Sequence, residues 1–207
     1  ARSRRCVTPP ANGDARSMQI LMIRHGRPET QNGASDPDLC DVGRKQARDL
    51  CAFLARSGVA RLVSSPLRRA LQTAAPTAEA LGLDVAVIDG LAEADRFGAG
   101  YRSIEELRRE PAVWDRFLAD PVGFLGADPV AFKREVLGAF DSVLTGGAAK
   151  VAVFTHGLPI NVVLSHALGL HRITHFVPHY CSISRLNGDS LDRLSVISVN
   201  ETTFLEF

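Results

Sequence analysis

Apolar residues occur along this chain in short runs that end at turn-forming or reactive residues. The first run, 19–23 (QILMI), is almost continuously apolar, which is typical of a strand buried on both faces. It ends at Arg24, His25 and Gly26, where we expect the glycine to let the backbone come close to a bound group. The strand therefore brings a cation and an imidazole to the edge at which open α/β sheets bind their ligands.

Strand-like and helix-like segments alternate along the rest of the chain. Further apolar runs predict strands at 61–64, 85–88 and 150–154, and helical spacing predicts helices over 41–57, 65–82 and 157–168. This alternation predicts an α/β fold, a three-layer αβα sandwich with a mainly parallel central sheet and helices on both faces.

The ends of two of these helices can be assigned from residue type. Asp41 is the predicted N-cap of the first helix, with Gly58 after its last turn. Ser65 is the predicted N-cap of the second, with Pro66 at its first helical position. We therefore expect the strand at 61–64 to turn directly into a helix whose exposed N-terminus can bind an anion.

Two regions depart from the simple alternation. Helical segments are predicted at 103–119 and 128–144, with a capping box from Ser103 to Glu106 and prolines that divide the region. We interpret them as a helical insertion over the edge formed by the C-terminal ends of the strands. Strands at 181–186 and 194–199, with a turn at 187–189, predict a closing hairpin.

Composition limits the class of protein. The 207 residues are enough for one sizeable core, so we predict one catalytic domain over 18–207 after a flexible extension over 1–17, with Met18 as a candidate natural start. A net charge of +1 gives no reason to expect nucleic-acid or membrane binding. The four cysteines form no C-x-x-C pair, and no apolar run approaches about 20 residues, the length of a spanning helix. The extension also lacks the apolar core of a secretory signal. Together these features favour a cytoplasmic protein.

Reactive residues follow several of the predicted strands. His156 follows the strand at 150–154, Arg69 lies in the opening turn of the helix after 61–64, and Glu93 lies in the loop 91–100. An arginine fork matches phosphate oxygens, and a neutral imidazole nitrogen can attack phosphorus. Phosphoryl transfer chiefly requires charge stabilisation, which arginines and helix N-termini provide.

Five segments together resemble one known family. RHG at 24–26, DPDLCDVGRKQA at 36–47, SPLRRALQTA at 65–74, Leu-x-Glu at 91–93 and THG at 155–157 are similar, in this order, to the histidine phosphatase superfamily, or phosphoglycerate mutase-like family. The resemblance runs from about residue 19 to the C-terminal hairpin.

The resemblance implies a role for each matching residue. His25 matches the nucleophile that becomes phosphorylated, and Glu93 matches the proton donor to the leaving group. Arg24, Arg69 and His156 match the residues that bind the phosphoryl group.

Three further residues extend this predicted site. Gly157 and Arg27 are additional candidates for phosphate binding. The spacing from Glu93 to the next glycine is one residue longer than the family pattern, so Asp95 is an alternative acid.

The sequence after the first motif separates two activities. Mutases of the family usually have Glu-Thr after RHG, whereas this chain has Arg27, Pro28 and Glu29. We therefore expect a metal-independent, cofactor-independent phosphatase of the histidine acid phosphatase type, acting on small phosphate monoesters. A phosphoglycerate-type mutase and a catalytically silent phosphate-binding module are the alternatives. A dinucleotide-binding oxidoreductase is disfavoured because no G-x-G-x-x-G follows the first strand.

Four histidines near the end of the chain do not make a convincing metal site. The residues are His166, His171, His175 and His179. Their spacings of 5, 4 and 4 run beyond the end of the predicted helix and no acidic partner is nearby, so we predict no metal. His179 or Tyr180 could instead contact substrate from a loop. The expected partner is a small phosphorylated substrate, and the sequence leaves a homodimer open.

Overall fold

A six-stranded sheet with the strand order β3-β2-β4-β1-β5-β6 forms the centre of the protein. The computed structural model describes residues 17–30, 34–97 and 101–205. Its strands are β1 (Met18–Arg24), β2 (Arg61–Ser64), β3 (Val85–Val87), β4 (Lys150–Thr155), β5 (Ile183–Gly188) and β6 (Ser195–Glu201). The first four are parallel, and β5 and β6 are antiparallel to their neighbours, which confirms the prediction of a mainly parallel sheet.

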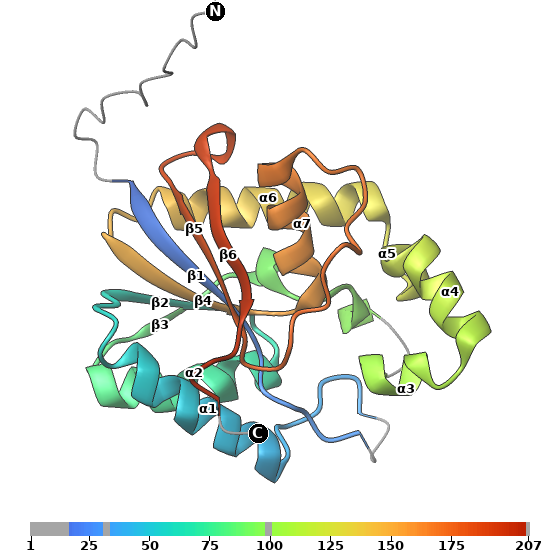
Figure 1. Ribbon diagram of the computed structural model, residues 1–207, viewed down its shortest axis with the longest axis horizontal. Coiled ribbons are helices and arrows are strands. Elements are labelled where there is room, and N and C mark those ends of the chain that lie inside the picture. The colour runs from blue at the N-terminus through green and yellow to red at the C-terminus, as the bar shows by residue number, and fades with distance from the viewer. Residues whose placement is uncertain (1–16, 31–33, 98–100, 206–207) are drawn as a thin grey trace, which may run out of the picture.

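Helices cover both faces of this sheet, and a group of short helices lies to one side of it (Figure 1). One face carries α1 (Asp41–Leu54) and α2 (Arg68–Leu81), and the other carries α6 (Pro129–Leu144) and α7 (Gly157–Leu168). The side group consists of α3 (Ile104–Arg108), α4 (Pro111–Ala119) and α5 (Pro121–Phe124). Three single 3-10 turns complete the described elements: η1 (Asp89–Leu91), η2 (Ala94–Phe97) and η3 (Leu191–Arg193). The predicted three-layer α/β architecture is confirmed.

Strand β1 is buried on both faces, as its apolar run predicts. Ile20 and Met22 belong to the hydrophobic core beneath α6 and α7. Leu21 and Ile23 belong to the separate core beneath α1 and α2. All four side chains are at most 1% exposed, because successive residues of a strand point to opposite faces of the sheet.

The predicted N-caps of the first two helices are wrong. Helix α1 has Cys40 at its N-cap, and Asp41 is instead its first residue, paired with Arg44 at 3.1 Å. Helix α2 begins at Arg68, three residues after Ser65. Ser65 still belongs to the edge of the sheet, since its backbone N–H donates to Phe154 O of β4 at 2.9 Å.

The N-terminus of α2 is already occupied by an anion of the protein itself. The Asp36 carboxylate accepts two hydrogen bonds from the Arg68 backbone N–H, at 2.9 and 3.1 Å. This carboxylate satisfies an otherwise unpaired helix donor and lies at the positive end of the helix dipole. The helix end that the sequence suggested for a ligand therefore serves to fix the loop before α1.

The middle of the chain is helical, but only part of it is an insertion. Pro111, Pro121 and Pro129 each start a helix, and the Ser103–Glu106 capping box is present. Helix α6 is not part of the predicted insertion, because its apolar side packs into the core on the face of the sheet. Only α3 to α5 extend beside the sheet (Figure 1).

The closing hairpin has a different turn from the predicted one. Residues 187 and 188 belong to β5, and the connection to β6 runs through η3. Strand β5 begins at Ile183, because Cys181 before it has a positive φ of 57°. The Cys181 N–H donates to the Arg24 carbonyl at 3.0 Å, which ties this turn to the end of β1.

Gly26 and Gly43 allow α1 to pack directly against the turn after β1. A Cβ on Gly43 would lie 2.0 Å from Arg27 O, and one on Gly26 would lie 2.7 Å from Gly43 O. The sequence predicted that Gly26 makes room for a bound group. The structure gives it a different neighbour, the backbone of α1.

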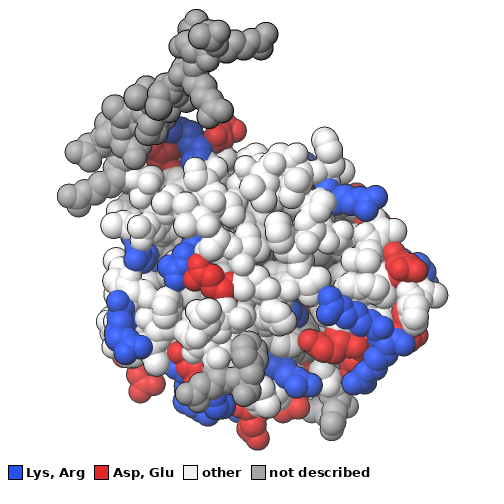
Figure 2. All heavy atoms as spheres, in the orientation of Figure 1, with Lys and Arg blue, Asp and Glu red and all other residues white. Residues whose placement is uncertain are grey.

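Surface features add little to the assignment of function. On the face shown in Figure 2, positive and negative side chains are interspersed around a largely uncharged centre. None of the described helices combines the length and apolar character needed to cross a membrane. The predicted extension lies, apart from Ser17, outside the described residues, so the proposed domain limits stay a prediction.

Candidate active site

The ends of parallel strands β1, β2 and β4 bring the predicted residues together at one edge of the sheet. Arg24 ends β1 opposite Thr155 of β4, and the His25 N–H donates to the Thr155 carbonyl at 2.9 Å. His156 follows β4 directly. The His25 and His156 rings consequently lie 5.0 Å apart between centroids, tilted by 54°.

The hydrogen bonds of His25 determine which ring nitrogen carries the proton. Its Nδ1 lies 2.7 Å from the Gly26 carbonyl oxygen, which can only accept. Nδ1 is therefore the protonated nitrogen, and Nε2 keeps its lone pair. Burial, followed by the charges of Arg69 and Arg24, holds the pKa of His25 well below its usual value, so the ring is neutral at neutral pH.

In His156 the hydrogen-bonded ring nitrogen is Nε2 instead of Nδ1. Its Nε2 lies 2.7 Å from the Ser65 hydroxyl oxygen, which accepts a hydrogen bond from the Leu67 N–H at 3.2 Å. Among the described residues Nε2 is the acceptor found for the Ser65 hydroxyl proton, and with this proton directed to Nε2 the ring proton is on Nδ1. That buried Nδ1 has no hydrogen-bond partner among the described residues, and burial together with Arg69 lowers the pKa of His156.

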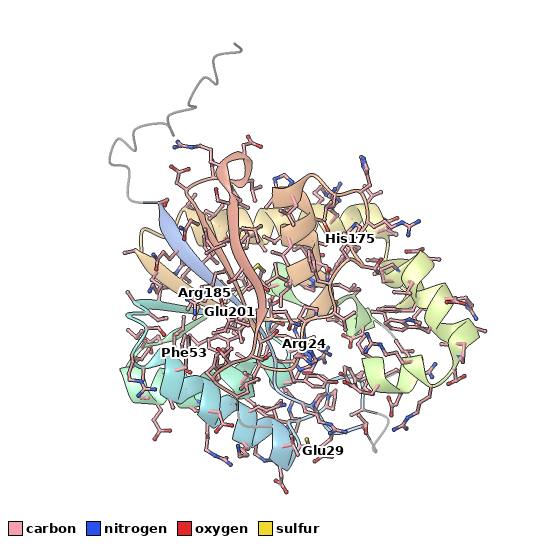
Figure 3. The ribbon with its side chains drawn as sticks, viewed as in Figure 1. Arg24, Glu29, Phe53, His175, Arg185 and Glu201 are labelled. Carbon is pink, nitrogen blue, oxygen red and sulfur yellow. The ribbon has the colours of Figure 1, made fainter. Side chains whose placement is uncertain are left out.

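Arg24 is held in place by contacts that leave its buried Nε without a partner among the described residues. Its Nη1 donates to the Pro178 carbonyl at 2.7 Å, and its guanidinium lies 4.0 Å from the centroid of the Tyr180 ring. Figure 3 places this side chain between the end of the sheet and the group of short helices.

Arg69, the second residue of α2, is fully buried and ion-paired. Its Nη2 donates to both oxygens of Asp95, at 2.8 and 2.9 Å, and its Nη1 lies 3.4 Å from Asp36. The Tyr101 ring lies 4.9 Å from its guanidinium carbon. As with Arg24, its Nε has no partner within the described part of the chain.

Glu93 is fixed at the first turn of α7. One carboxylate oxygen accepts from the Leu158 N–H at 3.1 Å, and the other accepts from the Ala94 N–H at 3.0 Å. Burial, and then the nearby Asp95 carboxylate, raise the pKa of Glu93 to about 7, although both hydrogen bonds oppose the shift. Glu93 can therefore give up or take up a proton near neutral pH.

A pocket opens from this centre toward α3 and α4. It encloses about 690 Å³ of space free of protein atoms, including the part open to solvent. Arg24, His25, Arg69, Glu93 and Asp95 line its inner end, together with Gly157.

Not every predicted residue reaches this pocket. Arg27 is exposed and lines a separate groove with His179. Tyr180 lines the same groove, although its ring centroid lies 5.7 Å from that of His25. His156 is fully buried behind His25 and is not among the residues that line the pocket. Among the described residues no three His, Cys, Asp or Glu side chains gather closely enough to hold a metal ion.

The sequence did not reveal the partners that hold the main residues. Ser65 belongs to a recognisable motif, but its residue type indicated a helix cap and gave no sign of a bond to His156. Tyr101 carried no signal, and Asp95 was identified only as an acid. These relationships depend on contacts between distant segments.

Comparisons with known proteins identify the family of this chain. The sequence profile of the histidine phosphatase superfamily (branch 1) matches residues 20–202. The bifunctional protein Rv2228c of Mycobacterium tuberculosis is 37% identical over 205 residues, covering 90% of this chain and 55% of that protein. The chain thus spans about half the length of this relative. The probable phosphoglycerate mutase GpmB of Proteus mirabilis is 29% identical over 182 residues, covering 82% of this chain and 85% of that protein.

The fold is also found in solved structures. That of a mycobacterial glucosyl-3-phosphoglycerate phosphatase, Rv2419c, has a TM-score of 0.72 and 22% sequence identity, and the match covers 90% of this chain and all of that one. Because the family profile matches nearly the whole described chain, this protein belongs to the histidine phosphatase superfamily, branch 1.

Proposed function

We propose that this protein is a phosphatase that hydrolyses phosphate monoesters through a covalent phosphohistidine on His25. One observation carries the proposal. Three buried donors have no partner among the described residues: Nε of Arg24, Nε of Arg69 and Nδ1 of His156. They belong to the two arginines whose charges act on His25 and to the histidine whose ring lies 5.0 Å from it, and His25 itself has a free Nε2. A phosphoryl group supplies several acceptor oxygens and negative charge, and it would satisfy donors that are costly to bury unpaired.

In the first step His25 Nε2 attacks phosphorus. The new N–P bond forms as the P–O bond to the leaving group breaks, and protonated Glu93 gives its proton to the departing alcohol oxygen. Arg24, Arg69 and His156 stabilise the charge on the equatorial oxygens. Glu93 suits this role because its pKa is raised to about 7, so its protonated form is well populated at neutral pH.

In the second step water replaces the histidine. Glu93, now ionised, takes a proton from the attacking water, the N–P bond breaks, and inorganic phosphate leaves. The same carboxylate thus acts as acid and then as base, which is efficient when its pKa lies near the working pH.

The relatives support this proposal in different degrees. Rv2419c is named a phosphatase, and GpmB is named a probable mutase, so phosphate transfer to a second substrate is the competing activity. The tripeptide that follows RHG here favours the phosphatase.

The test is phosphate release from a panel of phosphate esters, with chelator present, by the wild-type protein and by His25→Ala. We expect His25→Ala to lose roughly four decades of rate, about 5.5 kcal/mol of transition-state stabilisation. His171→Ala, an exposed histidine outside the pocket, is the matched control and should be fully active. An alkaline quench during turnover of a ³²P-labelled ester should trap label on His25.

Three results would contradict the proposal. An active His25→Ala protein would exclude the phosphohistidine route. Turnover only with a bisphosphorylated primer would indicate a mutase. Phosphate binding without any turnover would indicate a binding module.

A further inference from the structure

The pocket beyond the reaction centre has an apolar wall. The side facing the sheet edge is formed by α3, α4 and the turn after α5, through Ile104, Leu107, Trp114, Phe117, Leu118 and Leu125. Four of these side chains, Ile104, Trp114, Leu118 and Leu125, are only partly buried. Their uncovered surface lines a pocket, and apolar surface left uncovered in a concave site is characteristic of ligand binding.

The opposite wall is also apolar. Leu158 of α7, and Ile173 and Phe176 from the segment after α7, line it. Trp114 and Phe117 stack with ring centroids 5.4 Å apart and an interplanar angle of 21°. A flat ring entering between these walls would find aromatic and aliphatic neighbours on both sides.

The polar side chains of these walls are already engaged within the protein. The Asn161 amide donates to the Gly157 and Phe176 carbonyls, both at 2.9 Å, and accepts from the Phe176 N–H at 3.1 Å. Thr174 donates to the Leu118 carbonyl at 3.5 Å.

The cations are engaged as well. Arg102 pairs with Glu110 at 2.7 Å, and its side chain is 43% exposed. Arg24 and Arg69 lie at the inner end, where the phosphoryl group would bind. Among the described residues that line the pocket outside its inner end, Arg102 is the cation, so a carboxylate on the leaving group would have to lose its water and displace Glu110 to gain a partner.

From these walls we infer that the preferred substrates are phosphate monoesters whose leaving alcohol carries an apolar aromatic ring. This inference rests on the proposed phosphatase activity and specifies the substrate class of the same site. A leaving group with a carboxylate, such as that of 3-phosphoglycerate, is the disfavoured class.

The test compares phosphate esters whose leaving groups would place different chemical groups in the pocket. The P–O bond that breaks is of the same kind in all of them. Hydrolysis of 2-phenylethyl phosphate, ethyl phosphate and 3-phosphoglycerate by the wild-type protein is measured as kcat/KM. All three leaving groups are primary alkanols, so their intrinsic reactivity differs little. We expect 2-phenylethyl phosphate to exceed the other two by about 10- to 100-fold, the range for burying one ring-sized apolar group. A value for 3-phosphoglycerate equal to or above that for 2-phenylethyl phosphate would overturn the inference while leaving the phosphatase proposal intact.

A charge placed in the wall sharpens the comparison. Leu118→Lys should lower kcat/KM for 2-phenylethyl phosphate by about 10-fold, because the ring then meets a hydrated ammonium. The value for 3-phosphoglycerate should be unchanged or higher, since the new cation can pair with its carboxylate. Val130→Lys is the matched control, because Val130 is 74% exposed on α6 and does not line the pocket. Equal effects of Leu118→Lys on both esters would contradict the role assigned to the wall.

Binding of stable phosphonates separates this inference from the proposed function. Calorimetry compares 3-phenylpropylphosphonate with 2-hydroxy-4-phosphonobutanoate, in which a methylene replaces the bridging oxygen of each ester. Tighter binding of the phenyl compound supports the apolar substrate class even if no ester is hydrolysed. Tighter binding of the carboxylate compound would overturn it, whatever the activity.

Discussion

The Ser65 hydroxyl oxygen lies 2.7 Å from Nε2 of His156, across the ends of two neighbouring parallel strands. Both residues are fully buried. The serine follows β2 and the histidine follows β4, so the pairing of these strands sets the distance. With the hydroxyl proton directed to Nε2, the proton of His156 is on Nδ1, where it can be donated to a phosphoryl oxygen.

Replacing Ser65 should impair activity without removing any group that contacts substrate. In Ser65→Ala, His156 loses the partner that fixes its tautomer and orientation. We expect kcat to fall about 10-fold, which corresponds to about 1.4 kcal/mol, and inhibition by inorganic phosphate to weaken. Ser165→Ala is the control, because that hydroxyl is also buried and hydrogen-bonded but binds the Arg172 carbonyl far from the site. A Ser65→Ala protein with normal kcat and normal phosphate inhibition would show that the hydrogen bond has no role in positioning.

The raised pKa of Glu93 predicts opposite pH dependences for the two chemical steps. Formation of the phosphoenzyme needs protonated Glu93 and should slow as the pH rises through about 7. Hydrolysis of the phosphoenzyme needs ionised Glu93 and should slow as the pH falls below that value. Quenched-flow measurements between pH 5 and pH 9 separate the steps. Glu93→Gln should lose both dependences and about 10²- to 10⁴-fold in rate. If Glu93→Gln retains the pH dependence, another group is the acid.

The same shift predicts a pH-dependent effect on stability. Glu93 has its pKa raised from 4.5 to about 7 in the folded protein, so folding is favoured by its proton and this contribution is lost as the pH rises across that interval. Glu93→Gln should therefore gain stability relative to the wild type at pH 8, by up to about 3 kcal/mol, and gain little at pH 4. Urea unfolding at the two pH values measures the difference. An equal change in the free energy of unfolding at both pH values would contradict the raised pKa of Glu93.

Asp95 and Glu93 can be distinguished as acids through the ion pair with Arg69. Asp95 holds Arg69 through two hydrogen bonds and thus competes with a phosphoryl group for it. We expect Asp95→Asn to bind inorganic phosphate about 10-fold more tightly, because a competing negative charge is removed, and to keep kcat within roughly 10-fold. A loss in kcat as large as that of Glu93→Gln, with no gain in phosphate affinity, would make Asp95 the proton donor.

The contact between α1 and the turn after β1 predicts a structural effect of a single methyl group. Gly43→Ala would place its Cβ 2.0 Å from Arg27 O, so either α1 or the turn must move. We expect a loss of about 2 to 4 kcal/mol in the free energy of unfolding, together with reduced activity, since the turn carries His25. Gly138→Ala in α6 is the control. Its Cβ would meet nothing within 4 Å, and the change should be neutral or stabilising by up to about 1 kcal/mol. Equal stabilities of the two variants would show that α1 can shift at no cost.

The sequence by itself determined the sheet, most helices and the residues at the reaction centre. Apolar runs fix which segments are buried strands, and in parallel strands the residues that follow each run arrive at the same edge. Arg24, His25 and His156 could therefore be placed together from local patterns alone. These predictions succeed because the periodicity of a strand or a helix repeats within a few residues, so one short stretch of sequence contains it.

Only the tertiary structure decided which partners these residues have. The Arg68 N–H at the start of α2 is bound by a carboxylate from position 36, and no local signal near Ser65 contains that information. The ion pair of Arg69 with Asp95, the bond from Ser65 to His156 and the apolar walls of the pocket likewise join segments far apart in the chain. Such contacts depend on how helices and loops pack over the sheet, and packing is a property of the whole fold that no single stretch of sequence specifies.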